Sequence, residues 1–299
     1  MRGHDRSAGV TKSGGEGLLF GGRIVRQAEA CEQTNKRERP HMKWARGVTA
    51  DGTEITGVVS QGALHPRTGL GADQPAGDPV PLDDVTLLPP VMPGKFIGLW
   101  NNFAAAAEKN GQTHPEHPLY FLKPDSALSG PGAMVEIPAA AGRVVFEGEL
   151  GIVIGKTCKA VTPEQAEAAI LGYTCINDLT SLDVLTGDPS FPQWTRAKGF
   201  DGFGVAGPVI DTDVNWRDLE IKVMVDGRER QSYPAADMIL NPAQIVSLLS
   251  QDMTLNPGDL IACGTSLGAR PVKAGQRIEV VIEGIGTLGV TMTAPDTAA

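Results

Sequence analysis

Alternating apolar and polar positions at residues 146–154 predict a strand that carries two carboxylates. Side chains alternate between the two faces of a strand, so Glu147, Glu149 and Gly151 should share one face. The opposite face is apolar and predicts core: Phe146, Leu150, Ile152 and Ile154. Two residues of strand rise would separate the carboxylates by about 7 Å. The glycine beside them would keep the surface open.

Two interpretations fit this acidic pair. At an effective dielectric of about 20 the two charges repel by about 2 kcal/mol, so they must be solvated or neutralised. The pair could belong to an exposed edge strand, where acidic residues aid solubility. Alternatively, Glu147 and Glu149 bind a hard divalent cation, which requires a third oxygen ligand from elsewhere.

Asp178 is the candidate for that third ligand. It follows residues 173–176, a short apolar run that predicts a buried strand ending at Asn177. A carboxylate at the end of a strand is held in place by the sheet. An Asx turn formed by Asn177 and Asp178 is the alternative interpretation.

Periodic segments between turn signals predict the other elements. Thr162, Pro163 and Gln165 indicate a capped helix start, and Gly172 indicates its end. Further predictions are a helix over residues 103–109 that stops at Gly111, a strand at 120–123, a strand at 221–225 leading into an Asp226-Gly227 hairpin turn, a helix after Asn241, a strand at 260–262, and a closing hairpin of residues 278–283 and 287–292. Strands dominate, which predicts an α+β, predominantly β fold.

The chain divides into three regions by pattern. Residues 1–41 are polar and aperiodic and predict a disordered extension. Residues 42–90 carry short strand-like runs and predict a small N-terminal β domain. The prolines at 76–93 indicate a linker into a catalytic domain over residues 91–299.

Charge and cysteine usage narrow the partners. The net charge of −9 argues against nucleic acid or an anionic membrane surface as the main partner. No apolar run is long enough to span a bilayer. The four cysteines show no paired spacing, which favours a reduced, cytoplasmic location over a disulfide framework.

Histidine positions limit the kind of metal. None of the five follows His117. Zinc, copper and facial-triad iron sites are therefore disfavoured in the main body, and an oxygen-ligated Mg²⁺, Mn²⁺ or Ca²⁺ remains. A Ser-His-Asp triad is also disfavoured, unless the loop with His114 and His117 folds over the site.

Five motifs, in order, resemble those of the fumarylacetoacetate hydrolase family: FEGELGIVIGK, GYTCINDLTSLD, QWTRAKGFDGFGVAGP, PGDLIACGTSLGA and IEGIGTLGV. The resemblance runs from about Pro93 to the C-terminus. It implies a mixed β-sandwich roll, a bound Mg²⁺ or Mn²⁺, 2-oxo or 1,3-diketo acid substrates, and a homodimer.

The resemblance also implies roles for single residues. By motif match, Glu147, Glu149 and Asp178 would be metal ligands, with Lys198 beside the metal as a catalytic cation. Thr265, Gly264 and Lys123 would contact substrate. Independently of the resemblance, Arg196 would supply a cation next to the acidic cluster, as an anionic substrate requires. Without the resemblance, the glycine-rich loop at 264 could be a plain turn. Arg196 could be a counter-charge, and Lys123 a surface lysine.

Two positions depart from the family pattern. Family members that hydrolyse carbon–carbon bonds often carry a histidine and a glutamate in a lid segment. The matching stretch here, NNFAAAAE, has Ala105 at the histidine position and keeps Glu108, a candidate catalytic residue. Leu182 stands where the family usually has a substrate-binding arginine. The segment THPEHP is either an ordinary loop or a lid that brings His114 or His117 over the metal.

These observations predict a divalent-metal-dependent hydrolase that cleaves a carbon–carbon bond in an oxo acid. Hydrolysis requires a base aimed at water, typically a histidine-carboxylate pair. Decarboxylation does not, so a 2-oxo acid decarboxylase, or an isomerase acting on compounds such as 2-hydroxyhepta-2,4-diene-1,7-dioate, remains the alternative. A non-catalytic binder of metal and oxo acid is the third reading.

Overall fold

The computed structural model describes residues 41–295. The extension predicted for residues 1–41 lies outside the described residues except for His41. Within the described part, strands form three sheets and the helices are short, so the predicted α+β, predominantly β class is confirmed. No described helix is long and apolar enough to cross a membrane.

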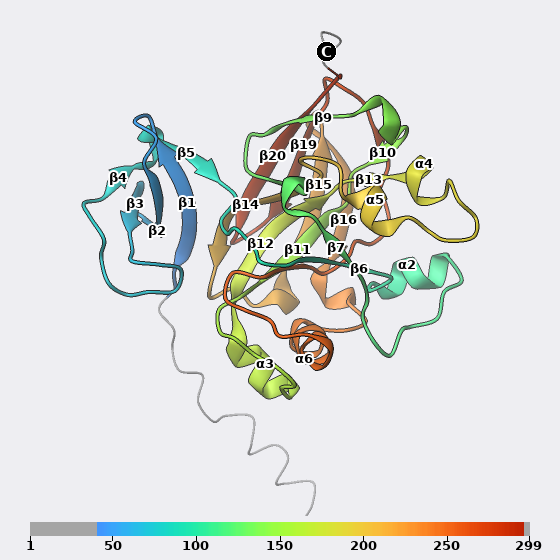
Figure 1. The fold of residues 1–299 in the computed structure, drawn as a ribbon, viewed down its shortest axis with the longest axis horizontal. Coiled ribbons are helices and arrows are strands. Elements are labelled where there is room, and N and C mark those ends of the chain that lie inside the picture. The colour runs from blue at the N-terminus through green and yellow to red at the C-terminus, as the bar shows by residue number, and fades with distance from the viewer. Residues whose placement is uncertain (1–40, 296–299) are drawn as a thin grey trace, which may run out of the picture. The chain divides into compact units, whose positions relative to one another are not determined.

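The largest sheet has twelve strands and contains β1, the first described strand (Figure 1). Its path is β4-β3-β2-β1-β14-β12-β11-β17-β6-β7, with β5 paired to β1 and β8 to β14. The strands are β1 (Lys43–Thr49), β2 (Glu54–Ser60), β3 (Ala63–Pro66), β4 (Val80–Pro81), β5 (Val85–Leu88), β6 (Phe96–Trp100), β7 (Leu119–Lys123), β8 (Leu128–Ser129), β11 (Gly148–Ile154), β12 (Ile170–Asp178), β14 (Gly204–Asp211) and β17 (Leu260–Ala262).

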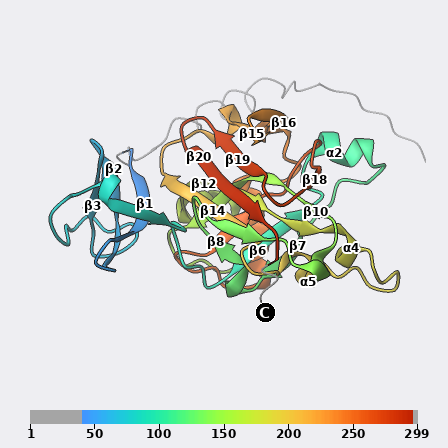
Figure 2. The same ribbon diagram turned by 90° about the horizontal axis from the view of Figure 1, so that it is seen from above.

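Two smaller sheets complete the β structure, and Figure 2 shows β15, β16, β19 and β20 together on one side. The five-stranded sheet contains β9 (Met134–Glu136), β15 (Glu220–Val225), β16 (Arg228–Pro234), β19 (Arg277–Ile282) and β20 (Gly286–Thr293). The three-stranded sheet contains β10 (Val144–Val145), β13 (Thr180–Ser181) and β18 (Pro271–Val272). The parallel pairs β17 with β6 and β20 with β9 make the twelve-stranded and five-stranded sheets mixed.

The described helices are short and lie between the strands in sequence. They are α2 (Ala104–Lys109), α3 (Pro163–Ala169), α4 (Leu182–Leu185), α5 (Trp194–Lys198) and α6 (Pro242–Asp252). Both α3 and α6 begin with a capping box, built on Thr162 with Gln165 and on Asn241 with Gln244, as the sequence predicts. The two helices pack against each other (Figure 1).

Strand β11 lies at the centre of the large sheet, between β12 and β17. All seven of its residues are buried. Leu150 and Ile152 pack into the larger hydrophobic core, and Val153 packs into a second core on the other face. The interpretation of this segment as an exposed acidic edge strand is therefore wrong.

Three local expectations are corrected. Gly172 does not end α3, which ends at Ala169. It lies inside β12, where a Cβ atom would come within 2.2 Å of the Asp211 carbonyl oxygen. Gly151 does not keep the surface open, because the Ile176 side chain fills that space. The proline-rich segment 76–93 is not a plain linker, because its strand β5 pairs with β1.

Candidate metal centre

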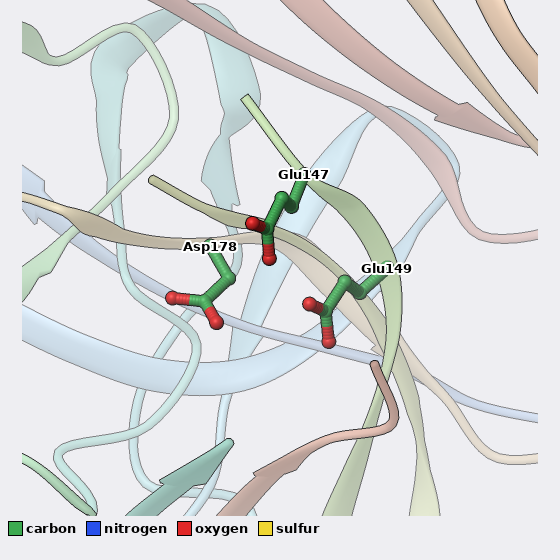
Figure 3. Close-up of side chains that lie close together, drawn as sticks. All are labelled: Glu147, Glu149 and Asp178. Atoms are coloured by element: carbon green, nitrogen blue, oxygen red, sulfur yellow. The ribbon is translucent and has the colours of Figure 1, made fainter. Parts of the chain in front are cut away.

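Three carboxylates from neighbouring strands meet at one end of the large sheet. Glu147 immediately precedes β11, Glu149 lies within β11, and Asp178 is the last residue of β12. One carboxylate oxygen from each lies within 4.8 Å of the others. Figure 3 shows the three carboxylates turned towards a common space. The pairing of β11 with β12 brings them together, since the Asp178 N–H donates to the Glu147 carbonyl oxygen at 2.8 Å.

Glu149 is fully buried, and only one of its two carboxylate oxygens has a hydrogen-bond partner among the described residues. Its Oε2 accepts a 2.6 Å hydrogen bond from the Gly264 N–H. Its Oε1 has no hydrogen-bond partner within the described part of the chain. Burial, together with the nearby charges of Asp178 and Glu147, raises the pKa of the Glu149 carboxyl well above its ordinary value. A buried carboxylate oxygen without a partner is costly unless something else binds it.

Asp178 is also buried, but it is paired on both oxygens. Lys123 Nζ lies 2.5 Å from Oδ1 and Lys198 Nζ lies 2.6 Å from Oδ2. Burial alone would raise the pKa of Asp178. The two ammonium groups outweigh it and hold that pKa below its ordinary value.

Glu147 completes the cluster from the side nearer solvent. Its Oε2 lies 2.7 Å from Lys198 Nζ, and its Oε1 accepts a 2.8 Å hydrogen bond from the Thr180 hydroxyl. Its side chain keeps 18% of its surface exposed, whereas that of Asp178 is fully buried. Solvent therefore reaches the cluster on the Glu147 side.

The two lysines differ in their electrostatic setting. Burial would lower the pKa of Lys198, but Asp178, Glu147 and Glu149 outweigh it and raise that pKa. Lys123 is buried too, and burial outweighs its pairing with Asp178 and lowers its pKa. The Lys198 ammonium also lies 5.0 Å from the centre of the Phe121 ring.

The peptide of Gly148, between the two glutamates, is held from both sides. Its N–H donates to Gln231 Oε1 at 3.2 Å. Its carbonyl oxygen accepts hydrogen bonds from the hydroxyls of Tyr233 and Thr265. The Gln231 amide also donates to Thr265 Oγ1 at 3.1 Å. These contacts fix the backbone between Glu147 and Glu149.

Gln231 and Tyr233 were missed by the sequence reasoning, although a signal was present. They are the inward-facing positions of β16, whose other residues are exposed. A buried glutamine on an alternating strand needs partners for its amide, and here those partners are Gly148 and residues 265–267.

Gly264 and Thr265, two of the predicted substrate contacts, also lie at the cluster. Gly264 has a φ of +90°, which favours glycine, and this turns its N–H towards Glu149. The Thr265 hydroxyl is already engaged with the Gly148 carbonyl oxygen. Lys123, expected to contact substrate, is paired with Asp178.

Other predicted site residues are not brought to the carboxylates. Arg196 is exposed and lines a surface pocket with Asp183, Asp188 and Gln193. Glu108 is exposed on α2, as are His114 and His117 in the loop that follows. Leu182 begins α4 and supplies no charge.

The donor set fits a hard divalent cation. Three carboxylates and two lysines give the cluster a formal charge of −1, which a divalent ion would change to +1. The unpartnered Oε1 of Glu149 offers a ligand atom. Oxygen donors of this kind suit Mg²⁺ or Mn²⁺.

Sequence comparison matches two family models to this chain. Residues 95–293 match the fumarylacetoacetate (FAA) hydrolase C-terminal model, and residues 42–90 match the Rv2993c-like N-terminal model. Protein Rv2993c from Mycobacterium tuberculosis is 42% identical over 226 residues, which cover 73% of this chain and 84% of that protein.

Solved structures show the same fold. A 2-hydroxyhepta-2,4-diene-1,7-dioate isomerase from Mycobacterium marinum is 38% identical, with a TM-score of 0.77, and the match covers 86% of this chain and 100% of that chain. Maleylpyruvate hydrolase from Sphingobium sp. SYK-6, solved with manganese(II) ion and pyruvate, is 30% identical, with a TM-score of 0.70, over 85% of this chain and 100% of that one. The ordered motifs, the mixed sheets and the family-model match over residues 95–293 agree, and this chain belongs to the fumarylacetoacetate hydrolase family.

Proposed function

We propose that the protein is a divalent-metal-dependent hydrolase that cleaves a carbon–carbon bond in a 2-oxo or 1,3-diketo acid. The observation that carries the proposal is the meeting of Glu147, Glu149 and Asp178 within 4.8 Å, in a member of this family. Lys123 and Lys198 pair with Asp178 and Glu147, but the buried Glu149 Oε1 has no partner among the described residues, and a bound ion would supply one.

Glu147, Glu149 and Asp178 would hold Mg²⁺ or Mn²⁺. When bound, such an ion supplies Lewis-acid polarisation of a keto oxygen and stabilises developing negative charge. The Sphingobium relative with manganese and pyruvate supports both the kind of ion and the kind of ligand.

The chain's own residues would position and stabilise the substrate. Lys198 carries a fixed positive charge, held in place by Glu147 and Asp178. It would stabilise negative charge that forms on an oxo-acid oxygen. The loop at Gly264 and Thr265 borders the cluster and would contact the substrate carboxylate. Lys123 would keep Asp178 ionised.

A second candidate is an isomerase or decarboxylase on the same site. Ala105 replaces the family histidine, and Glu108 faces solvent. Hydrolysis through Glu108 therefore requires residues 104–118 to close over the cluster, whereas decarboxylation of a chelated oxo acid needs no base and isomerisation needs a proton carrier but no activated water. The similarity to the Mycobacterium marinum isomerase favours this candidate.

A substrate panel separates these functions. Acetylpyruvate, fumarylpyruvate, oxaloacetate and 2-hydroxyhepta-2,4-diene-1,7-dioate are incubated with Mg²⁺, Mn²⁺ or EDTA, and the products are identified. We expect metal-dependent cleavage of an acylpyruvate that Glu149→Ala abolishes and that Glu283→Gln, at the exposed β19–β20 turn, retains. Exclusive loss of CO₂ or isomerisation would select the second candidate. Metal binding without any turnover would indicate a binder.

We also propose a homodimer in the cytoplasm. Strand β7 is the last strand on the described path of the large sheet, and Tyr120 and Leu122 on it are 40% and 43% exposed. Such an apolar edge suits pairing with a second copy. The described cysteines, Cys158, Cys175 and Cys263, are free and buried, which fits a reducing compartment. Light scattering on purified protein tests the dimer.

A further inference from the structure

A row of apolar side chains leads from the carboxylate cluster to the protein surface. Lys198 Nζ lies 5.0 Å from the Phe121 ring centre. The Phe121 ring stacks on Trp194, with centres 5.6 Å apart and planes 11° apart. Trp194 in turn contacts Trp100 at 5.6 Å. Trp194 and Lys198 lie one turn apart on α5, so both can face Phe121.

The outer end of this row is exposed and shares the face of the sheet that carries Glu149. In the pairing of β6 with β7, Gly98 lies opposite Phe121, and Trp100 lies opposite Leu119. Residues directly opposite each other in an antiparallel pair share a face. Trp100 keeps 38% of its surface exposed and Leu119 keeps 42%. Phe121, Trp194, Trp100 and Leu119 are called the aromatic shelf below.

The charges of the cluster suit a substrate with a single carboxylate. With a divalent ion bound, the cluster would carry a formal charge of +1, which one carboxylate neutralises. A second carboxylate would need a cation of its own. Among the described residues, the ion pairs of the cluster use Lys123 and Lys198 and no arginine. Leu182 replaces the family arginine, and Arg196 lines a pocket with Asp183.

We propose that the aromatic shelf binds the tail of the substrate, and that this tail is apolar and planar, as in a 4-aryl-2,4-dioxo acid. The inference rests on the proposed function, because the oxo-acid head must lie at the carboxylate cluster. The shelf then removes the tail from water by stacking on Trp100 and Trp194. A tail that ends in a carboxylate would lose its hydration without gaining a partner.

The test compares three substrates with different tails in the presence of Mn²⁺: benzoylpyruvate, acetylpyruvate and fumarylpyruvate. We expect kcat/KM to be at least about tenfold higher for benzoylpyruvate than for fumarylpyruvate, the order of discrimination that an apolar pocket provides. Trp100→Ala should lower kcat/KM for benzoylpyruvate about tenfold and change that for acetylpyruvate less than about twofold. Leu119→Lys should raise kcat/KM for fumarylpyruvate, because the lysine supplies a cation for its second carboxylate.

Met134→Ala is the control, because Met134 is an exposed apolar residue on β9 of the five-stranded sheet, outside both the aromatic shelf and the β7 edge. It should leave the preference unchanged. Higher kcat/KM for fumarylpyruvate in the wild type would overturn the inference while leaving the proposed function intact. A change of oligomeric state by Trp100→Ala, without a change of preference, would also overturn it and assign the shelf to a subunit interface.

Binding provides a readout that does not depend on turnover. Tryptophan fluorescence is titrated with phenylpyruvate and with oxaloacetate in the presence of Mn²⁺. We expect phenylpyruvate to bind at least about tenfold more tightly, and Trp100→Ala to remove the difference. If no substrate is turned over but phenylpyruvate still binds more tightly, the proposed reaction is wrong and the binding of an apolar tail by the aromatic shelf is supported. Equal binding of the two acids overturns the shelf.

Discussion

Glu149 and Glu108 are both proposed to act in one site, yet their surroundings differ sharply. Glu149 lies in the central strand of a sheet, is fully buried, and accepts a hydrogen bond from Gly264. Glu108 lies on the six-residue helix α2 and is exposed. The strand-borne residues are assembled before any ligand arrives, whereas the residues of α2 and its following loop are not. The structure therefore assembles the proposed ion ligands and leaves the proposed acid-base residues of α2 and its following loop exposed.

The difference bears directly on the reaction. The proposed ion binding and charge stabilisation would use Glu147, Glu149, Asp178 and Lys198, which are already together. Activation of water needs a base within hydrogen-bond reach of the substrate. Only closure of residues 104–118 would bring Glu108, His114 or His117 there. Substitutions in the carboxylate cluster and substitutions in residues 104–118 should therefore have different effects on metal affinity and on turnover.

Substitution Glu149→Ala should have the largest effect. It removes one of three carboxylates, so the affinity for Mn²⁺ should fall by more than about 100-fold, beyond the effect of losing a residue that only orients a ligand. Turnover should be lost with it. Isothermal titration calorimetry measures the affinity, with Glu283→Gln as the control. Unchanged Mn²⁺ affinity in Glu149→Ala would remove Glu149 from the ion site.

Substitution Lys198→Met should destabilise the metal-free protein by about 3 kcal/mol, because it leaves Asp178 and Glu147 without a cation that both contact. Saturating Mn²⁺ should reduce this loss, since a divalent ion replaces the missing charge. Urea unfolding with Mn²⁺ and with EDTA measures both values. Equal losses in the two conditions would show that the ion binds away from these carboxylates.

Substitution Gln231→Leu should weaken Mn²⁺ binding about tenfold, an effect typical of residues that orient metal ligands. The leucine cannot accept the Gly148 N–H, so the backbone between Glu147 and Glu149 loses a restraint. Gln251→Leu on α6 removes exposed glutamine hydrogen bonds and serves as the control. Comparable losses of affinity in both variants would indicate a general effect on folding.

Substitution Glu108→Ala should leave the Mn²⁺ affinity within about twofold of the wild type, because an exposed side chain away from the cluster adds little to it. If the enzyme is a hydrolase, kcat for cleavage should still fall about 100-fold, the usual contribution of general acid-base catalysis. His114→Ala and His117→Ala identify the partner in the same assay. Full cleavage by all three variants would show that none of these side chains is the base, and a wild type that isomerises or decarboxylates without cleavage would favour the second candidate.

The same contrast explains what the sequence could predict. The sequence predicts the three carboxylates of the cluster. Glu147 and Glu149 are spaced to share one strand face, and Asp178 follows a second predicted strand. The family motifs indicate the fold. The contact of Lys123 with Asp178 and that of Gln231 with Gly148 join residues more than 50 positions apart, so neither follows from local pattern. Arg196 and Lys198 lie two residues apart on the short helix α5. They therefore point in different directions, and Lys198 is buried whereas Arg196 is exposed.

The central claim is tested most directly by crystals grown with Mn²⁺ and measured at its absorption edge. The account predicts one anomalous peak in each chain, among the carboxylate oxygens of Glu147, Glu149 and Asp178, at about 2.0–2.2 Å. An anomalous peak elsewhere would contradict the account. So would the absence of a peak among these carboxylates while Lys198 still contacts both Glu147 and Asp178.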